Sequence, residues 1–403
     1  MKIISGGVTA AKGFTAAGVH CGIRKNHSKK DLALIVSSAD AAAAGVYTTN
    51  LVKGAPVQVT SKHIREGGKL RAVICNSGNA NTCTSDGIEK AEMMCRLVSD
   101  RLGVSSDEIA VASTGVIGQT LPIEPIENAM DGLFAELSED GSENAALAIM
   151  TTDTVKKEIA VEFTLGGKTC RMGGIAKGSG MIHPNMATML VFITTDAEVP
   201  SETLQRILSA DIRNTFNMVS VDGDTSTSDM VIVLANGMAE NGCLTAEDEA
   251  ELTAALRAVT GYLCKMIAAD GEGATKLLEC RVSGAFTEAD ARIAAKSVIG
   301  SSLLKAAMFG ADANWGRVLC AVGYSGANVD VDRVDVSFES AAGTIEVCRA
   351  GRGVDFSEEL AKKILSEKEI AIVIGLNSGD GCATAWGCDL TYDYVRINGD
   401  YRT

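Results

Sequence analysis

Two adjacent glycines, Gly166 and Gly167, constrain the fold of this chain more than any other local feature. They separate the predicted strands 159–165 and 169–172. A glycine pair at this spacing is typical of a tight turn between two antiparallel strands. Parallel neighbours would need a long crossover, usually a helix, between them. The pair therefore favours antiparallel pairing and an α+β fold class over the regular βαβ repeat of a dinucleotide-binding fold.

Short runs rich in β-branched residues predict further strands, and segments with helical spacing of apolar residues predict helices. The predicted strands include 32–36, 57–60, 71–75, 343–348 and 370–374. The predicted helices are 87–103, 124–137, 201–217, 247–269 and 288–308. A chain of 403 residues is long enough for about two domains. The change of pattern near residue 281 predicts domains 1–280 and 281–403.

Charge and cysteine usage exclude several classes of function. The formal net charge of -14 predicts a surface that repels nucleic acid and anionic membranes. The sequence has neither an uninterrupted apolar run of membrane-spanning length nor a signal-peptide pattern at its start, which predicts a cytoplasmic protein. The 12 cysteines form no Cys-x-x-Cys pair and the 4 histidines are far apart, so we expect reduced thiols and no metal site.

A glycine-rich run, 177–187, leads into Thr188, and an apolar strand-like segment follows it. A hydroxyl at that point is suited to attack the preceding carbonyl, which would cut the Ala187–Thr188 bond and free the α-amine of Thr188. Because such an amine has a pKa of about 7.7 to 8.0, it can act as the base for its own hydroxyl. The alternative is an ordinary strand threonine after a flexible loop, and spacing alone does not decide between the two.

Acyl transfer also needs donors that stabilise the negative charge on the reacting oxygen. Thr114 and Gly115 lie in the run 111–118, where the glycine lets backbone N–H groups turn inward and the threonine adds a hydroxyl. A plain strand-to-helix turn is the other interpretation. The asparagine-rich run 76–81 follows a predicted strand, and it fits either a pocket-lining loop or a set of turn formers.

Two acidic loops are candidate ligand sites. Glu272 lies between glycines directly after a predicted helix, where it would either receive an ammonium group or be a solvated turn residue. The segment 221–229 is similar to a calcium-binding loop but lacks the glutamate that such a loop needs at its twelfth position. Metal binding is therefore not expected there.

Taken together, these runs resemble the bifunctional ornithine acetyltransferase/N-acetylglutamate synthase family of arginine biosynthesis. The resemblance covers nearly the whole chain. It rests on the runs already quoted and on segments 6–14, 150–154, 214–218, 270–276, 309–317 and 394–403. Ser228, Ser302, Ala306 and Gly399 depart from the family pattern, and only Gly399 lies beside an expected site residue.

The resemblance implies a role for several residues. It implies that Thr188 is the nucleophile after self-cleavage between Ala187 and Thr188, with Thr114 and Gly115 as the oxyanion hole. The substrate contacts that it implies are Thr151 or Thr152, Lys177, Thr188, Glu272, Asn398 and Thr403. On charge, Lys177 suits a substrate carboxylate and Glu272 suits the side-chain ammonium of ornithine.

The resemblance also implies an αββα sandwich of two sheets between helices, of the self-cleaving N-terminal-threonine type, with a smaller C-terminal α/β domain. The implied reaction moves acetyl from N-acetyl-ornithine to glutamate through an acetyl-threonine, without a cofactor, and some relatives also accept acetyl-CoA. The implied assembly contains two alpha and two beta fragments from one precursor. The alternatives are a self-processing aminopeptidase or amidase and a non-catalytic metabolite-binding subunit.

Overall fold

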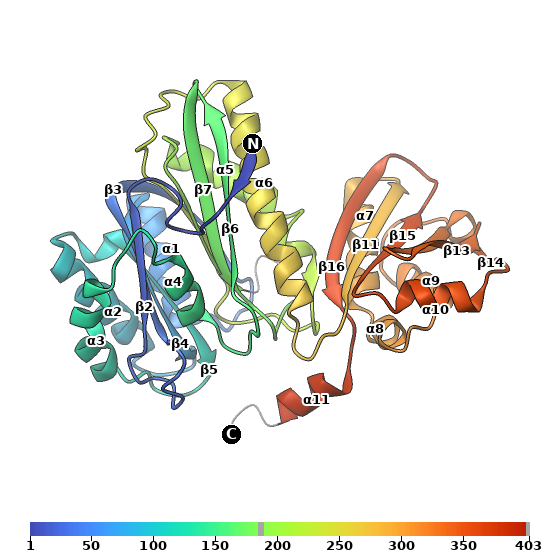
Figure 1. Cartoon of the computed structure of the whole chain (residues 1–403), viewed down its shortest axis with the longest axis horizontal. Helices are drawn as coiled ribbons and strands as arrows, with labels where there is room; N and C mark the ends of the chain where they lie inside the picture. The colour runs from blue at the N-terminus through green and yellow to red at the C-terminus, as the bar shows by residue number, and fades with distance from the viewer. Residues whose placement is uncertain (184–188, 400–403) are drawn as a thin grey trace. The chain divides into compact units, whose positions relative to one another are not determined.

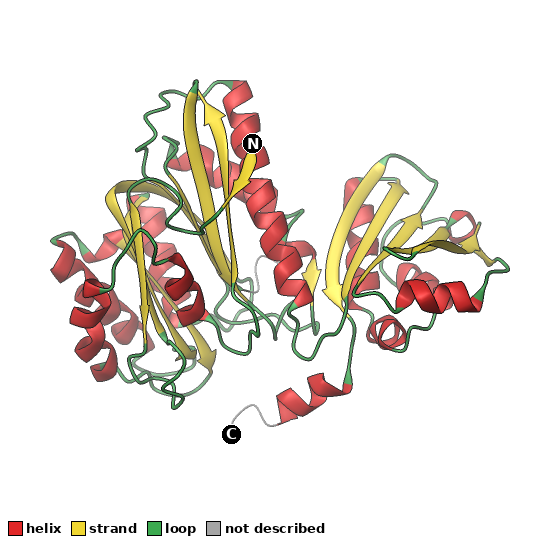
Figure 2. Cartoon of the chain, viewed as in Figure 1, coloured by secondary structure: helices red, strands yellow, loops and turns green. Residues whose placement is uncertain are grey.

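A computed structural model describes residues 1–183 and 189–399 of the chain. These residues form two compact units, each assembled from separate segments. The first unit contains the described residues of 1–178, 189–213 and 225–263, and the second contains those of 179–183, 214–224 and 264–399. Each unit combines its own sheet with helices, so the predicted α+β class is confirmed (Figure 2).

The first unit is built on one large sheet. Along the sheet its strands are β1 (Lys2–Ile4), β6 (Lys157–Leu165), β7 (Lys168–Lys177), β8 (Leu190–Thr195), β10 (Met230–Ala235), β3 (Leu32–Tyr47), β4 (Lys69–Asn79) and β5 (Ile109–Val116), while β2 (Phe14–Val19) pairs with β3. The predicted hairpin is confirmed, because β6 and β7 pair antiparallel. Gly166 and Gly167 adopt φ values of 53° and 75° in its turn, which suits a two-residue hairpin loop.

The long strand β3 connects two parts of this sheet. Its first half pairs with β2 and β4, and its last residues pair with β10, with an irregular register between Val36 and Ala41. One buried cluster contains Val73 of β4 together with Phe192 of β8 and Ile232 of β10. Side chains from both parts of the sheet therefore share one core, and the small helix α4 (Ser142–Ile149) contributes to it.

Helices cover the outer faces of the two sheet parts. α2 (Gly87–Leu102) and α3 (Glu124–Ala135) share a second buried cluster with the other face of β3, β4 and β5. On the other side, α5 (Ser201–Ile212) contacts β3, and α6 (Ala246–Ala269) packs on β7, where Val259 and Leu263 are the neighbours of Gly174. The layers are helix, sheet, sheet, helix, as the predicted sandwich requires (Figure 1).

The second unit is built on a separate mixed sheet. Along the sheet its strands are β14 (Arg352–Gly353), β13 (Gly343–Arg349), β12 (Asp335–Ser340), β15 (Glu369–Gly375), β11 (Leu277–Ala285), β16 (Gly381–Cys388) and β9 (Val219–Ser220). Its helices are α7 (Glu288–Gly300), α8 (Ser302–Phe309), α9 (Trp315–Gly323), α10 (Glu358–Leu365) and α11 (Tyr392–Gly399). α7 packs along β11 and β16, and the last helix, α11, carries Asn398 (Figure 1).

One predicted strand is wrong. The segment 57–60 lies in helix α1 (Ala55–Gly67), which begins with Pro56 in its first turn and ends at Gly68 with φ 66°. Val57, Thr60 and Ile64 are buried on one face, and the Thr60 hydroxyl donates to the Val111 carbonyl oxygen of β5. Packing at helical spacing therefore overrides the β propensity of the valines.

Two predicted helices need new limits. The segment 201–217 is helical only as far as Ile212, and a separate 3-10 turn covers Phe216–Met218. The segment 288–308 is two helices, because Ser301 interrupts it and its side chain accepts the Leu304 amide at the start of α8. Asp248 accepts the Thr245 amide while Thr245 accepts the Asp248 amide in return, a reciprocal capping pair at the start of α6.

α6 is also long and apolar enough to cross a membrane by length and composition, but half of its most apolar window is buried inside the protein. All 12 cysteines lie in the described ranges, where no disulfide bond is formed. The residues that the structure describes contain no cluster of three or more His, Cys, Asp or Glu side chains able to hold a metal ion.

Candidate active site

The predicted oxyanion residues lie at the end of β5, beside β4. Gly115 pairs with Gly78 of β4 and has a φ of 134°. A Cβ atom at position 115 would lie 2.3 Å from the carbonyl carbon of Gly78, so the neighbouring backbone leaves no room for a side chain. Thr114 is buried next to it. Both residues therefore belong to strand β5, in close contact with β4, and not to the turn that follows it.

The asparagine-rich run continues β4 as far as Asn79, so it is less of a loop than its composition indicates. Asn76 donates to the Asn79 carbonyl oxygen and accepts from the Ser113 hydroxyl, at 2.9 and 2.6 Å. Asn79 donates to the Gln119 carbonyl oxygen at 3.1 Å. These amide side chains hold the backbone around the end of β5, which is a structural role beside the predicted oxyanion residues.

Lys177 joins the predicted oxyanion residues to a buried charge cluster. Its ammonium donates to the Thr114 hydroxyl at 3.4 Å. Asp153 accepts from the ammonium of Lys157 and from the Gly178 amide, both at 2.7 Å. Burial by itself would raise the pKa of Asp153, but the positive charges of Lys157 and Lys177 lower it to about 2. Asp153 is therefore an anion shared by two lysines.

A second buried carboxyl faces the same lysine. Asp229 precedes β10, and its Oδ2 has no hydrogen-bond partner among the described residues. Burial raises the pKa of Asp229 well above its ordinary value, although Ser226 and the charge of Lys177 act in the opposite direction. Asp153 is therefore the carboxylate that the two ammonium groups stabilise, while burial disfavours ionisation of Asp229.

Both backbone polar groups of Thr151 form hydrogen bonds to side chains. Thr152, the next residue, is partly exposed. The Thr151 amide donates to Asp153 at 2.9 Å, and the Thr151 carbonyl oxygen accepts from the guanidinium of Arg24 at 2.9 Å. Arg24 also touches Gly78, where an added Cβ would meet its side chain at 2.9 Å. Arg24 therefore contacts both the Thr151 segment and the strand that pairs with Gly115.

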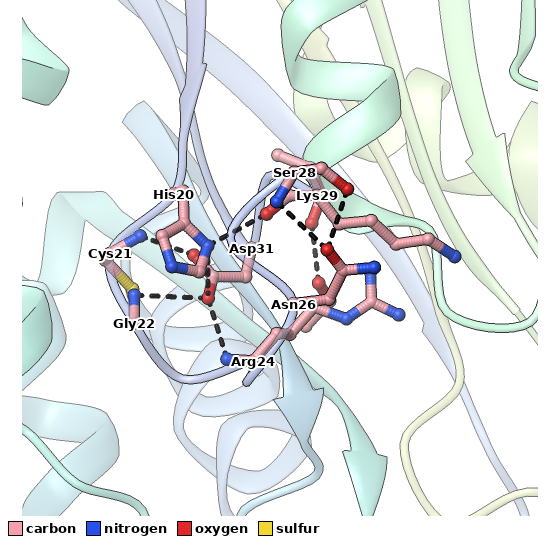
Figure 3. A network of polar contacts seen from close by, with 10 residues as sticks. His20, Cys21, Gly22, Arg24, Asn26, Ser28, Lys29 and Asp31 are labelled. Carbon is pink, nitrogen blue, oxygen red and sulfur yellow. Dashed lines mark hydrogen bonds and ion pairs between the residues drawn. The ribbon is translucent and has the colours of Figure 1, made fainter.

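Sequence reasoning missed Arg24 and the residue that positions it. Figure 3 shows the carboxylate of Asp31 inside the 20–31 loop, where it accepts the amides of Cys21, Gly22 and Arg24 at 2.6, 3.3 and 2.8 Å. Asp31 is fully buried directly before the apolar strand β3. An acidic residue at the edge of an apolar run was the available signal, since an acid buried there needs hydrogen-bond donors.

Two predicted substrate residues meet in the second unit. The side-chain amide of Asn398 donates to the Glu272 carboxylate at 2.7 Å. Glu272 is 7% exposed, and a Cβ at Gly180 would lie 2.4 Å from its carboxyl group. The Glu272 amide donates to the Ser179 carbonyl oxygen at 3.0 Å. Glu272 is therefore not a solvated turn residue, because it packs against the glycine-rich run and is bonded to the C-terminal helix.

Ala187, Thr188 and Thr403 lie outside the described residues. Their sequence neighbours Met189 and Leu190 are described, and both are buried. The Met189 carbonyl oxygen accepts the Met230 amide at 2.9 Å, and Leu190 pairs directly with Lys177. The residues that follow the predicted nucleophile are thus fixed in the first unit beside the lysine that contacts Thr114.

Comparison with known proteins agrees with the resemblance drawn from the motifs. The ArgJ family model matches residues 15–403. Two relatives described as the arginine biosynthesis bifunctional protein ArgJ match over 100% of both chains, at 51% identity in Caldanaerobacter subterraneus subsp. tengcongensis and 53% in Symbiobacterium thermophilum. A solved structure of Mycobacterium tuberculosis ornithine acetyltransferase complexed with ornithine is 39% identical over 46% of this chain and 99% of that one, with a TM-score of 0.43. The chain therefore belongs to the ArgJ family, the bifunctional enzymes of arginine biosynthesis.

Proposed function

We propose that this enzyme transfers acetyl from N-acetyl-ornithine to glutamate through an ester on the hydroxyl of Thr188. The contact between Lys177 and Thr114 is the observation that carries the proposal. It joins a buried ammonium to the predicted oxyanion residues, and the same lysine pairs with Leu190, shortly after Thr188. A nucleophile, oxyanion donors and a carboxylate partner are the parts that transfer from an acetylated amino acid needs.

Self-cleavage comes first in this proposal. The Thr188 hydroxyl oxygen attacks the carbonyl carbon of Ala187, the new C–O bond replaces the peptide C–N bond, and the hydroxyl proton ends on the freed amine. Water then hydrolyses the ester, which leaves a carboxylate on Ala187 and restores the hydroxyl of Thr188. The products are an alpha fragment ending at Ala187 and a beta fragment starting at Thr188, and we propose an assembly with two of each.

The transfer cycle uses the free amine of Thr188 as the base. It accepts the hydroxyl proton while the oxygen attacks the acetyl carbonyl, and the negative oxygen is stabilised by the Gly115 amide and the Thr114 hydroxyl. Ornithine leaves with that proton on its α-amine. Glutamate then attacks the acetyl ester through its own α-amine and leaves as N-acetylglutamate. The cycle balances without a cofactor, and acetyl-CoA is an alternative acetyl donor.

Substrate recognition follows from charge. Lys177 is proposed to bind the substrate α-carboxylate, and the contact of its buried ammonium with the Thr114 hydroxyl supports this role. Glu272 is proposed to receive the side-chain ammonium of ornithine, with Asn398 orienting the carboxylate through its 2.7 Å hydrogen bond. Thr151 or Thr152 and the terminal Thr403 complete the proposed contacts. We also propose a cytoplasmic enzyme, in keeping with its membership of a family of arginine biosynthesis.

Thr188→Ala tests the central step. The variant has no hydroxyl, so it should remain one uncut chain on a denaturing gel and should lose acetyl transfer. The wild-type protein should give two fragments, with N-terminal sequencing of one starting at Thr188, and mass spectrometry should find an acetyl group on that residue after N-acetyl-ornithine is added. Wild-type activity in an uncut Thr188→Ala chain would end the proposal.

Two further readouts separate the proposal from its alternatives. Release of free acetate much faster than transfer to glutamate would indicate a hydrolase of the amidase type. An intact wild-type chain that binds ornithine but never carries acetyl would indicate a binding subunit. Glutamate acetylation with acetyl-CoA as the sole donor, compared with the N-acetyl-ornithine rate, tells a bifunctional enzyme from one that only recycles acetyl.

A further inference from the structure

One buried carboxylate joins two segments of the first unit that carry predicted substrate contacts. Oδ2 of Asp153 accepts the Thr151 amide at 2.9 Å, and Oδ1 accepts the Gly178 amide at 2.7 Å. Thr151 lies between α4 and β6, whereas Gly178 directly follows Lys177, the last residue of β7. One side chain therefore links the threonine segment to the end of the strand that carries the lysine.

Both linked amides lie where regular structure ends. α4 ends at Ile149, before Thr151, and β7 ends at Lys177, before Gly178. Gly178 is buried and Thr151 is half-buried. A buried backbone N–H needs a hydrogen-bond partner, and here neither a helix nor a strand ladder provides it. The Asp153 carboxylate provides it for both amides, so the paths of the two segments depend on one side chain.

The carboxylate is kept ionised inside this unit. The side chains of Asp153 and Lys157 are both fully buried, and the Lys157 ammonium donates to Oδ1 at 2.7 Å. Burial would raise the pKa of Asp153, but the charges of Lys157 and Lys177 lower it to about 2. An ionised carboxylate accepts hydrogen bonds at both oxygens, which is what two amide links from one side chain require.

We propose that Asp153 is a positioning residue for substrate binding, because its carboxylate sets the spacing between the Thr151 segment and Lys177. The proposal rests on the proposed function, which assigns contacts in both places to the substrate. The substrate α-carboxylate proposed to bind Lys177 does not react. A loosened spacing should therefore weaken binding of the amino-acid substrates without removing any reacting group.

The size of the effect follows from the number of links that remain. Loss of one charge-assisted hydrogen bond should lower the population of the linked arrangement about 10-fold, and the apparent affinity falls by the same factor. Asp153→Asn keeps one acceptor oxygen and loses one link, whereas Asp153→Ala loses both. The KM values for N-acetyl-ornithine and for glutamate should rise about 10-fold in Asp153→Asn and about 100-fold in Asp153→Ala, with kcat within about twofold of wild type.

Two further variants separate this role from general damage to the fold. Asp211→Asn is the matched control, since Asp211 is equally buried in the same unit but is bonded to Arg257 and Thr260 of α6. Its KM values should equal those of wild type. The double variant Asp153→Asn/Lys157→Met removes both charges of the buried pair, and its KM values should rise as in Asp153→Asn. Thermal melting establishes that each variant is folded.

Hydrogen exchange tests the two links in the absence of substrate. The amides of Thr151 and Gly178 should both lose protection in folded Asp153→Ala, and one of them should lose protection in Asp153→Asn. Both should stay protected in Asp211→Asn. Wild-type protection of both amides in Asp153→Ala would overturn the proposal, because the links would then not depend on the carboxylate.

Failure of this proposal is distinct from failure of the proposed function. A wild-type enzyme that transfers no acetyl from N-acetyl-ornithine removes the proposed function itself. Normal wild-type transfer together with wild-type KM values in folded Asp153→Ala removes only the role of Asp153, as does an equal rise in Asp211→Asn or a fall in kcat at unchanged KM. If Asp153→Ala does not fold, the double variant decides the test, and wild-type KM values in that variant overturn the role.

Discussion

The two segments on either side of the predicted cleavage point are held by different kinds of interaction. After it, β8 is buried along its whole length and pairs with a strand on each side, antiparallel to β7 and parallel to β10. Before it, residues 179–183 contain the exposed Met181 and the half-buried His183. Side chains hold much of this segment, through Asp222 and through Ser220, whose hydroxyl lies 2.9 Å from His183 Nδ1.

This difference fits the proposed cleavage of one peptide bond. A strand paired on both sides keeps its position when the bond before it is cut, because its ladder hydrogen bonds do not depend on that bond. A segment held mainly by a few polar side chains is easier to release or rearrange, since each such hydrogen bond contributes only about 1 to 3 kcal/mol. We infer that β8, after the predicted cleavage point, is the more firmly held of the two segments.

The largest effect is expected from weakening the packing of strand β8. Phe192 of β8 is 1% exposed within the shared core. Phe192→Ala should lower the free energy of unfolding by about 3 to 5 kcal/mol, the usual cost of deleting a buried phenylalanine side chain. Denaturant unfolding measures it, with Leu51→Ala as the control at a 97% exposed position. Equal free energies of unfolding for the two variants would contradict the inference that β8 is the more firmly held segment.

A smaller effect, on catalysis alone, is expected from removing the hydrogen bond between Arg24 and Thr151. Arg24→Gln removes a charged donor from the Thr151 carbonyl oxygen, a hydrogen bond worth about 1.5 kcal/mol or more. The kcat/KM for N-acetyl-ornithine should fall about tenfold, and Arg24→Lys should recover part of the loss. Lys25→Gln changes the exposed neighbouring cation and should leave the kinetics unchanged. If Lys25→Gln lowers kcat/KM as much as Arg24→Gln does, the effect is due to surface charge alone.

The smallest effect is expected in the pH dependence of the segment 179–183, which contains His183. Burial, and then the charge of Lys296, lower the pKa of His183 from 6.5 to about 4, while Asp224 opposes this shift. The folded state therefore disfavours the protonated ring, so stability is complete above pH 6.5 and is lost as the pH falls toward 4. An NMR titration should place the ring pKa near 4. Hydrogen exchange at Met181 and Ile182, corrected for intrinsic rates, should show protection falling over that range.

His183→Gln is the control for the pH response, because glutamine does not titrate. Protection of the Met181 and Ile182 amides should therefore fall less in that variant than in wild type between pH 6.5 and 4. A ring pKa near 6.5 in the wild-type protein would mean that His183 is solvated. The polar contacts of segment 179–183 would then be weaker than the structure indicates.

Much of the fold follows from local sequence pattern. The Gly166–Gly167 turn, strands such as 71–75 and helices such as 87–103 were predictable, because side-chain periodicity and turn residues act over a few neighbours. The segment 57–60 was not predictable on the same basis. Its valines favour a strand locally, whereas the burial of Val57 and Ile64 at helical spacing depends on β5, a distant part of the chain.

The site divides in the same way. Sequence by itself determined the residue types of the proposed chemistry: a threonine after a glycine-rich run, a Thr-Gly pair and a lysine and glutamate of opposite charge, each readable in a short motif. Only the tertiary structure decided that Lys177 contacts Thr114, that Arg24 joins Thr151 and that Asp222 holds Met181. The physical reason is that these partners are far apart in the chain, and no local propensity encodes a contact that exists only when separate strands and loops pack together.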